Sequence, residues 1–349
     1  MSQTESRLFF LVSGEHPELP QAEVKAILES ENIPYRVIGS GYRLIILESS
    51  SRALGRVADR SLMTELCGHV VSEIQSGSDS IAKIPESQNL TSFLSEGESF
   101  SVRSVRIAGG QSRMRRVQLE RDLGKLIAKE RQGVRVNLNN PSKTFLAILT
   151  PDKALLGLIT NAREKGVVSR RRPRKRPYFH PSTMQPKLAR CMVNLARPRP
   201  GEILLDPFCG IGGHLIEAGL MGCRVVGVDV KRRMLRAANR NLAFFGVKAE
   251  GLLLGDARKL PLSLIQSIAT DPPYGRGAST IGATPRDLLT AFLAEITGVL
   301  GEGAFVCLAA AKETGALDIG RECGFEVVEN YDIYVHRNLT RRLVVFKWK

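Results

Sequence analysis

The chain is predicted to have an α/β fold: a doubly wound, mostly parallel sheet in its second half, preceded by an α+β region. From about residue 200 onward, short apolar strand patterns alternate regularly with amphipathic helix patterns, as parallel sheets require. Residues 325–349 contain two strand patterns with no helix between them, which predicts an antiparallel hairpin at the sheet edge. Before about residue 160 the patterns are typical of small α+β units.

The first region predicts two such units, over 1–60 and 61–162. Their strands show apolar residues at every second position and their helices at every third or fourth. The expected elements are a strand over 7–13, a helix over 20–32, a strand–turn–strand over 35–49, a strand over 99–107, a helix over 116–132 and a hairpin over 144–160.

In the second half the expected elements follow one another without long loops, which is typical of βαβ units. They are strands over 202–206, 224–230, 249–257, 265–274 and 304–310, and helices over 212–222, 232–246 and 285–300.

Positive charge is concentrated in two stretches of the chain, whose formal net charge is +15. Residues 101–135 hold ten basic and three acidic side chains, and residues 163–177 hold eight and one, so each stretch has a net charge of +7. Such density favours a polyanion, because Lys and Arg displace condensed counterions from phosphate backbones. A solvated face is the alternative for either stretch, and an anionic membrane surface is disfavoured because no apolar stripe accompanies the run.

Residues 163–177 are predicted to form a basic linker, because they are too charged and too often interrupted by proline for a core element. The candidate RNA-binding residues are Arg103, Arg106, Arg170, Arg171, Arg172, Arg174, Lys175 and Arg176.

Several classes of protein are not indicated. The apolar run from Leu8 to Val12 is too short for a signal peptide or a membrane span, so we expect a cytoplasmic protein. The six cysteines are scattered without a CxxC pair, which predicts neither a zinc site nor a disulfide scaffold. We expect no metal, and the sequence does not indicate whether there is a protein partner.

The strongest functional signal is an aspartate at the end of each of four successive strand patterns: Asp206, Asp229, Asp256 and Asp271. A single aspartate after a strand is often only a helix N-cap. In a parallel sheet, however, the carboxyl ends of the strands meet at one edge, where ligands bind. The four together therefore predict one ligand site.

The first two strand ends indicate a cofactor that contains adenosine. The turn "DPFCGIGG" places three glycines before a helix, where they permit close approach of a ligand to the helix N-terminus. Asp229 then stands where a carboxylate can hold two ribose hydroxyls, and Asp256 can reach an adenine edge.

In this order, "DPFCGIGG", "GVDV", "GDA" and "DPPY" resemble the motifs of S-adenosylmethionine-dependent methyltransferases that act on exocyclic amines of bases. The stretch "YFHPSTMQPKLARCMVNLA" resembles the N-terminal helix motif of that class. With the basic α+β region in front, the whole chain most resembles the archaeal tRNA guanosine-10 N2-methyltransferases, which carry ferredoxin-like and THUMP domains. The resemblance implies a Rossmann-like class I methyltransferase domain over 178–349, a ferredoxin-like domain over 1–60 and a THUMP-like domain over 61–162.

The resemblance also implies roles for individual residues. S-adenosyl-L-methionine would be bound by His180, Met184, Asp206, Phe208, Gly210, Asp229, Val230, Asp256 and Ala257. For Phe208 filling of the core is an equal alternative, and His180 and Met184 could equally be packing residues. The catalytic residues would be Asp271, Pro272, Pro273 and Tyr274.

The chemistry of guanine explains why "DPPY" suits such an enzyme. The exocyclic amine is conjugated with the ring and is a poor nucleophile, so its lone pair must be localised on nitrogen. Asp271 and the carbonyl of Pro272 can accept its two N–H groups, and the second proline stiffens that carbonyl. Tyr274 can stack on the base, and Asp271 can take the proton late.

Three alternatives remain open. A tRNA guanosine-6 N2-methyltransferase and a DNA adenine-N6 methyltransferase would present the same motif, and a non-catalytic RNA-binding protein could retain the fold. The basic region before the catalytic half favours RNA, and we see no target-recognition domain after it. Whether the amine receives one methyl group or two is not predicted.

Overall fold

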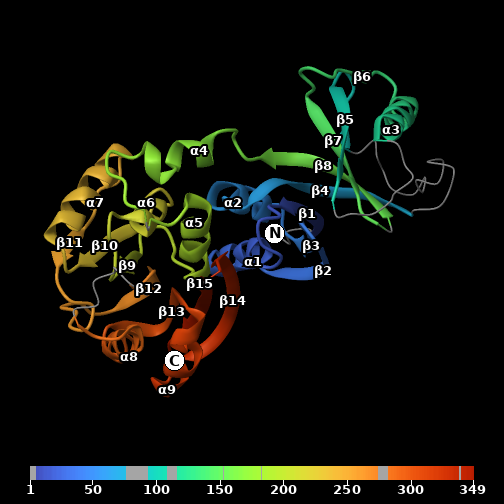
Figure 1. Ribbon diagram of the computed structural model, residues 1–349. Helices are drawn as coiled ribbons and strands as arrows, with labels where there is room; N and C mark the ends of the chain where they lie inside the picture. Colours follow the sequence, from blue (N-terminus) through green and yellow to red (C-terminus); the bar gives the residue numbers. More distant parts are fainter. Residues whose placement is uncertain are drawn as a thin grey trace. The chain divides into compact units, whose positions relative to one another are not determined.

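The computed structural model describes residues 5–75, 93–107, 116–151, 153–181, 183–273, 282–337 and 339–349. The chain forms two compact units (Figure 1). The first comprises Met1–Gln21, Ile33–Asp59 and Thr64–Arg163, and the second comprises Ala22–Asn32, Arg60–Met63 and Glu164–Lys349. Within the described residues, no helix has both the length and the apolar character needed to cross a membrane.

The first unit is built on an eight-stranded sheet with the strand order β2-β3-β1-β4-β8-β7-β5-β6. Its strands are β1 (Ser6–Val12), β2 (Tyr35–Gly41), β3 (Leu44–Ser49), β4 (Thr64–Gln75), β5 (Ser99–Arg106), β6 (Arg135–Val136), β7 (Lys143–Leu149) and β8 (Lys153–Ala162). The predicted hairpin is confirmed, because β7 and β8 pair antiparallel.

Strand β4 joins the two segments that the sequence divides at residue 60. It pairs antiparallel with β1 on one side and with β8 on the other, so both segments contribute to one sheet. Helix α2 (Arg52–Arg60) precedes β4, and α3 (Arg116–Glu130) packs on β5 with Leu119, Leu123 and Ile127 buried. The division into ferredoxin-like and THUMP-like domains remains a proposal.

The second unit is a doubly wound sheet with the strand order β11-β10-β9-β12-β13-β15-β14. Its strands are β9 (Ile203–Asp206), β10 (Arg224–Asp229), β11 (Gly251–Leu254), β12 (Ile265–Thr270), β13 (Leu300–Ala311), β14 (Glu326–His336) and β15 (Leu339–Lys347). Strands β9 to β13 pair in parallel, whereas β15 runs antiparallel to both β13 and β14. The mostly parallel sheet with a C-terminal hairpin is confirmed.

Helices cover both faces of this sheet (Figure 1), which explains why its strands read as continuous apolar runs. On one face, α8 (Pro285–Ile296) and α9 (Ala316–Glu322) pack with residues such as Phe292 and Phe346 into one core. Three further helices, α5 (Pro186–Leu195), α6 (Gly213–Gly219) and α7 (Arg232–Phe244), contact one another in sequence and pack on β9, β10, β12 and β13.

A buried polar cluster explains why residues 22–32 and 60–63 belong to the second unit. Glu23, on α1 (Leu19–Ser30), is buried and accepts hydrogen bonds from Ser61 Oγ at 2.5 Å, Met63 N at 3.1 Å and Asn194 Nδ2 at 2.8 Å. Burial raises the pKa of Glu23, and these three donors oppose the shift. The contact with Asn194 fixes α1 to α5.

The predicted basic linker contains regular structure and is anchored to the second unit. It includes α4 (Val167–Arg171), which contacts α5, and a 3-10 turn over Pro173–Lys175. Arg171 and Arg190 both bind the buried carboxylate of Glu217, at 3.0 Å and 2.9 Å. An unpaired buried carboxylate is strongly unfavourable. The pair of Arg171 with Glu217 therefore holds the segment against α6, and the pair of Arg190 with Glu217 joins α5 to α6.

Candidate functional site

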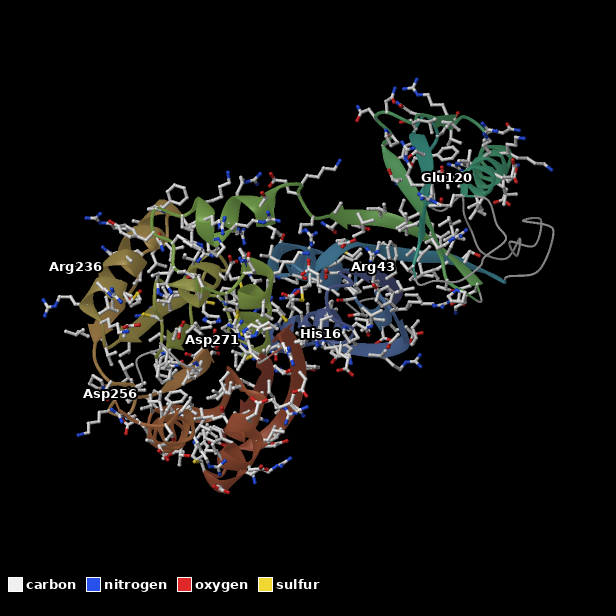
Figure 2. All side chains as sticks on the ribbon, in the orientation of Figure 1. His16, Arg43, Glu120, Arg236, Asp256 and Asp271 are labelled. Carbon is white, nitrogen blue, oxygen red and sulfur yellow. The ribbon has the colours of Figure 1, made fainter. Side chains whose placement is uncertain are left out.

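A cavity of about 410 Å³ opens at the sheet edge where β9 to β12 end, in the size range of small-molecule sites. The side chains that follow β11 and β12 include the labelled Asp256 and Asp271 (Figure 2). The predicted site residues that line the cavity are His180, Met184, Asp206, Phe208, Gly210, Asp229, Val230, Asp256, Ala257, Asp271, Pro272 and Pro273. Tyr274 lies outside the described residues.

The glycine turn after β9 contributes to the lining of the cavity. Gly210 and Gly212 have φ values of 51° and 86°, in the left-handed region that glycine adopts without strain. Cys209 N donates to Val228 O at 2.9 Å, and Gly210 N donates to Asp229 Oδ2 at 3.1 Å. These bonds tie the first turn to the end of β10, so the two predicted cofactor segments are held together.

Asp206 links the ends of β9 and β12 beneath the cavity. Its Oδ1 accepts hydrogen bonds from Thr270 Oγ1 at 2.7 Å and Phe208 N at 3.2 Å, and its Oδ2 lies 3.0 Å from His214 Nδ1. Thr270 directly precedes Asp271 in the chain. The Asp206 carboxylate therefore fixes the backbone from which Asp271 extends.

Asp229 and Asp256 have opposite electrostatic settings. Burial raises the pKa of Asp229, although Lys231 N and Gly210 N both donate to its carboxylate. Asp256 accepts two parallel bonds from Arg258, from Nε to Oδ1 at 3.0 Å and from Nη2 to Oδ2 at 2.6 Å, and this contact lowers its pKa. Both carboxylates line the cavity, where they can accept hydrogen bonds from a bound ligand.

The last strand end carries Asp271, and an arginine from a distant strand faces it. Arg341 Nη2 lies 3.7 Å from Asp271 Oδ2, and each side chain is 17% exposed. Arg341 and Leu339, both from β15, line the cavity. Sequence reasoning missed Arg341, because it lies 70 positions after Asp271 and shows no pattern of its own.

For Phe208, Met184 and His180 the sequence left two interpretations open, a contact with the cofactor or packing in the core. Phe208 lines the cavity and also packs edge-to-face on Phe292, with ring centroids 5.1 Å apart. Met184 is buried and His180 is half-buried, and both line the cavity. Sequence reasoning also missed His214, Lys231 and other lining residues; the position of His214 in the first turn after the glycines was the available signal.

Cys209 also lines the cavity. The pKa of this thiol is raised well above its ordinary value, mainly by burial and further by the nearby carboxylates of Asp206 and Asp229. The thiol is therefore protonated at neutral pH and unsuited to nucleophilic catalysis. Within the described residues, no group of three or more His, Cys, Asp or Glu side chains is arranged to hold a metal ion.

The basic residues predicted to bind RNA differ in exposure. In the first unit Arg103 and Arg106 are exposed on β5. In the second unit Arg170, Arg172, Arg174 and Lys175 are all exposed. Arg171 instead binds Glu217.

Arg176 was predicted to bind RNA, but the structure places it in the interior of the protein. Its side chain is only 5% exposed, and its guanidinium donates from Nε and Nη2 to Arg171 O. A buried guanidinium that holds the backbone in this way cannot extend to a phosphate, so the predicted RNA contact of Arg176 is not supported.

The chain resembles known proteins in both sequence and fold. Residues 173–341 match the family model described as RMKL-like, methyltransferase domain. The chain is similar over its whole length to the crystal structure of TrmN from Thermus thermophilus, with a TM-score of 0.54, 20% identity, and coverage of 98% of this chain and 100% of that one. The crystal structure of SMU.472 in complex with SAH gives a TM-score of 0.53, 15% identity, and coverage of 100% and 99%.

A curated relative extends the similarity to sequence. The tRNA (guanine(10)-N2)-dimethyltransferase of Methanothermobacter thermautotrophicus is 38% identical over 346 residues, which are 97% of this chain and 99% of the relative. Identity at this level along both chains shows that the protein belongs to the tRNA (guanine(10)-N2)-dimethyltransferase family of S-adenosylmethionine-dependent methyltransferases.

Proposed function

We propose that the protein transfers methyl groups from S-adenosyl-L-methionine to the exocyclic amine of guanosine 10 in tRNA, and that it does so twice. The convergence of Asp206, Asp229, Asp256 and Asp271 on one cavity is the observation that carries this proposal. The dimethyltransferase activity for which the 38% identical relative is named supports guanosine 10 and two transfers.

The residues present fit the cofactor. Asp229 would accept hydrogen bonds from the ribose hydroxyls, and Asp256 would accept one from the adenine amine. Phe208 and Met184 supply apolar contacts, and the turn at Gly210 leaves room for close approach. When bound, S-adenosylmethionine supplies a methyl group on a positively charged sulfur.

The residues after β12 would prepare the amine. The Asp271 carboxylate and the Pro272 carbonyl accept its two N–H groups, which directs the nitrogen lone pair away from the ring and toward the methyl group. As the methyl group passes to the nitrogen, the S–C bond would break and leave its electron pair on the sulfur. The methylated nitrogen would then carry a positive charge and release one proton to Asp271. In a second transfer only one N–H remains, so one of the two acceptors must hold the methylated base.

The tRNA would be bound through basic residues at the surface of each unit, considered separately. In the second unit, Arg172, Arg174 and Lys175 lie on the anchored basic segment, where Arg174 also stacks over Phe179 at 5.7 Å. Helix α7 adds further arginines, and in Figure 2 the labelled Arg236 extends outward from this helix. In the first unit, Arg103 and Arg106 support RNA binding by the THUMP-like segment.

Incubation of an unmodified tRNA transcript with enzyme and S-adenosylmethionine should yield N2-methylguanosine and then N2,N2-dimethylguanosine at position 10. Nucleoside mass spectrometry with mapping of the modified position is the measurement. A transcript with adenosine at position 10 serves as the matched control and should remain unmethylated. Methylation of guanosine 6, methylation of adenine in DNA, or absence of transfer would each contradict the proposal.

Replacement of Asp271 by Ala should reduce single-turnover methyl transfer by about 100-fold or more. The variant lacks the carboxylate that accepts a hydrogen bond from the amine and that takes its proton after the transfer. The affinities for tRNA and S-adenosylmethionine should change little. Asp271→Asn keeps the size of the side chain but removes its charge, and it should be nearly as impaired. Wild-type turnover in either variant would show that the mechanism is wrong.

The raised pKa of Asp229 predicts how cofactor affinity depends on pH. Ribose hydroxyls need the carboxylate form, so S-adenosylmethionine binding should weaken as pH falls through a pKa above the ordinary aspartate value of 3.8. Calorimetric titrations from about pH 8 down to about pH 4.5 test this. Asp229→Asn should bind about tenfold or more weakly at neutral pH and should lack this part of the pH dependence. Retention of the wild-type pH profile by Asp229→Asn would refute the assignment.

Simultaneous replacement of Arg172, Arg174 and Lys175 by Ala should weaken tRNA binding. The slope of the logarithm of the binding constant against the logarithm of salt concentration should become shallower by about 0.7–0.9 for each phosphate that is no longer neutralised. Filter-binding titrations at several salt concentrations measure this slope. The matched control replaces Arg36, Arg224 and Arg321, which are exposed and already paired with carboxylates. Equal effects in the two triple variants would mean that only net charge matters.

A further inference from the structure

Arg341 is a charged residue beside Asp271 that has no role in the mechanism proposed so far. Its guanidinium lies 3.7 Å from the Asp271 carboxylate, and both side chains line the cavity while being mostly shielded from solvent. At this distance the contact is an ion pair rather than a direct hydrogen bond. Because the pair is partly desolvated, it is weakened by salt much less than a surface pair.

The sheet topology brings these two residues together. Strand β15 runs antiparallel to β13, so its amino end lies at the same edge as the carboxyl ends of the parallel strands. Strand β13 separates β12 from β15, which places the two backbones about 10 Å apart at the usual strand spacing. Only a long side chain can span that distance.

The sequence of β13 leaves a path for that side chain. Ala311 pairs directly with Arg341, and paired residues in an antiparallel ladder project from the same face. Ala309 is the next residue of β13 on that face. Larger side chains at these two positions would stand between Arg341 and Asp271, so the alanines permit the ion pair.

We propose that Arg341 is a positioning residue that keeps Asp271 ionised and aimed at the reacting amine. The inference rests on the proposed function and adds a residue to it. The positive charge makes Asp271 a weaker base, so that it accepts a hydrogen bond from the neutral amine without removing its proton. The proton leaves only after the methyl group has been transferred, when the cationic nitrogen is a strong acid and a weak base is sufficient.

The other carboxylates at the cavity have their own contacts. Asp206 binds Thr270 and His214, Asp229 binds backbone N–H groups, and Asp256 binds Arg258. The titratable and charged side chains that line the cavity, besides Asp271 and Arg341, are His180, Asp206, Cys209, His214, Asp229, Lys231, Arg233 and Asp256. The carboxylates among them favour protonation of Asp271, whereas the cations Lys231, Arg233 and Arg341 oppose it, and Arg341 forms an ion pair with Asp271.

The test compares Arg341→Met, which keeps much of the length but removes the charge, with Arg341→Lys, which keeps the charge. Steady-state kcat and KM for the tRNA transcript are measured in the full-length protein from about pH 5 to about pH 9. Arg341→Met should lower kcat at neutral pH by about tenfold and move the acidic limb of the kcat profile up by about one pH unit or more. Arg341→Lys should reverse most of both effects.

Two controls separate this role from a structural one. Arg342→Met removes a neighbouring ion pair of the same strand, because Arg342 binds Asp332 at 2.6 Å without lining the cavity; its acidic limb should match the wild type. In an Asp271→Asn background, Arg341→Met should change the residual turnover by less than about twofold, since the charge on which it acts is gone.

If the wild-type enzyme methylates guanosine but the acidic limb of the Arg341→Met profile is not shifted, this inference is wrong and the proposed function stands. A higher KM for tRNA with unchanged kcat also overturns it, because that result would make Arg341 an RNA contact. If the wild-type enzyme leaves guanosine unmethylated, the proposed function fails and this inference fails with it.

Discussion

The parallel arrangement of β9, β10, β11 and β12 is the constraint on which the site depends. Each strand ends at the same edge of the sheet, and each has an aspartate at or just after its end that faces one cavity. No single loop could bring four carboxylates so close without a rigid support beneath them. The reversed direction of β15 adds Arg341 at the same edge, so one sheet determines where both charges of the Asp271–Arg341 pair lie.

Hydrogen bonds beneath the cavity connect cofactor binding to the chemistry. Asp206 joins the glycine turn to Thr270, and Asp229 accepts from the same turn through Gly210 N. A displacement of the glycine turn would therefore move the segment that carries Asp271. These bonds tie the segment proposed to hold the methyl donor to the segment proposed to hold the acceptor.

Local patterns in the sequence were sufficient to predict the doubly wound sheet, its hairpin and the strand-end aspartates. The spacing of apolar residues and the positions where strands end are both visible in short stretches of sequence. Residues whose roles depend on partners far away in the chain were not predictable. Arg176 and Arg174 look alike within the basic run, yet Arg176 is buried. Glu217, which anchors Arg171, and Arg341, which faces Asp271, gain their importance only through tertiary contacts.

A crystal structure of the enzyme with S-adenosylhomocysteine and a tRNA substrate would test the central claim most directly. We expect guanine N2 to lie within about 3 Å of both the Asp271 carboxylate and the Pro272 carbonyl oxygen, with the sulfur on the opposite side of the nitrogen. A base bound outside the cavity, or an N2 beyond hydrogen-bonding distance of Asp271, would contradict it.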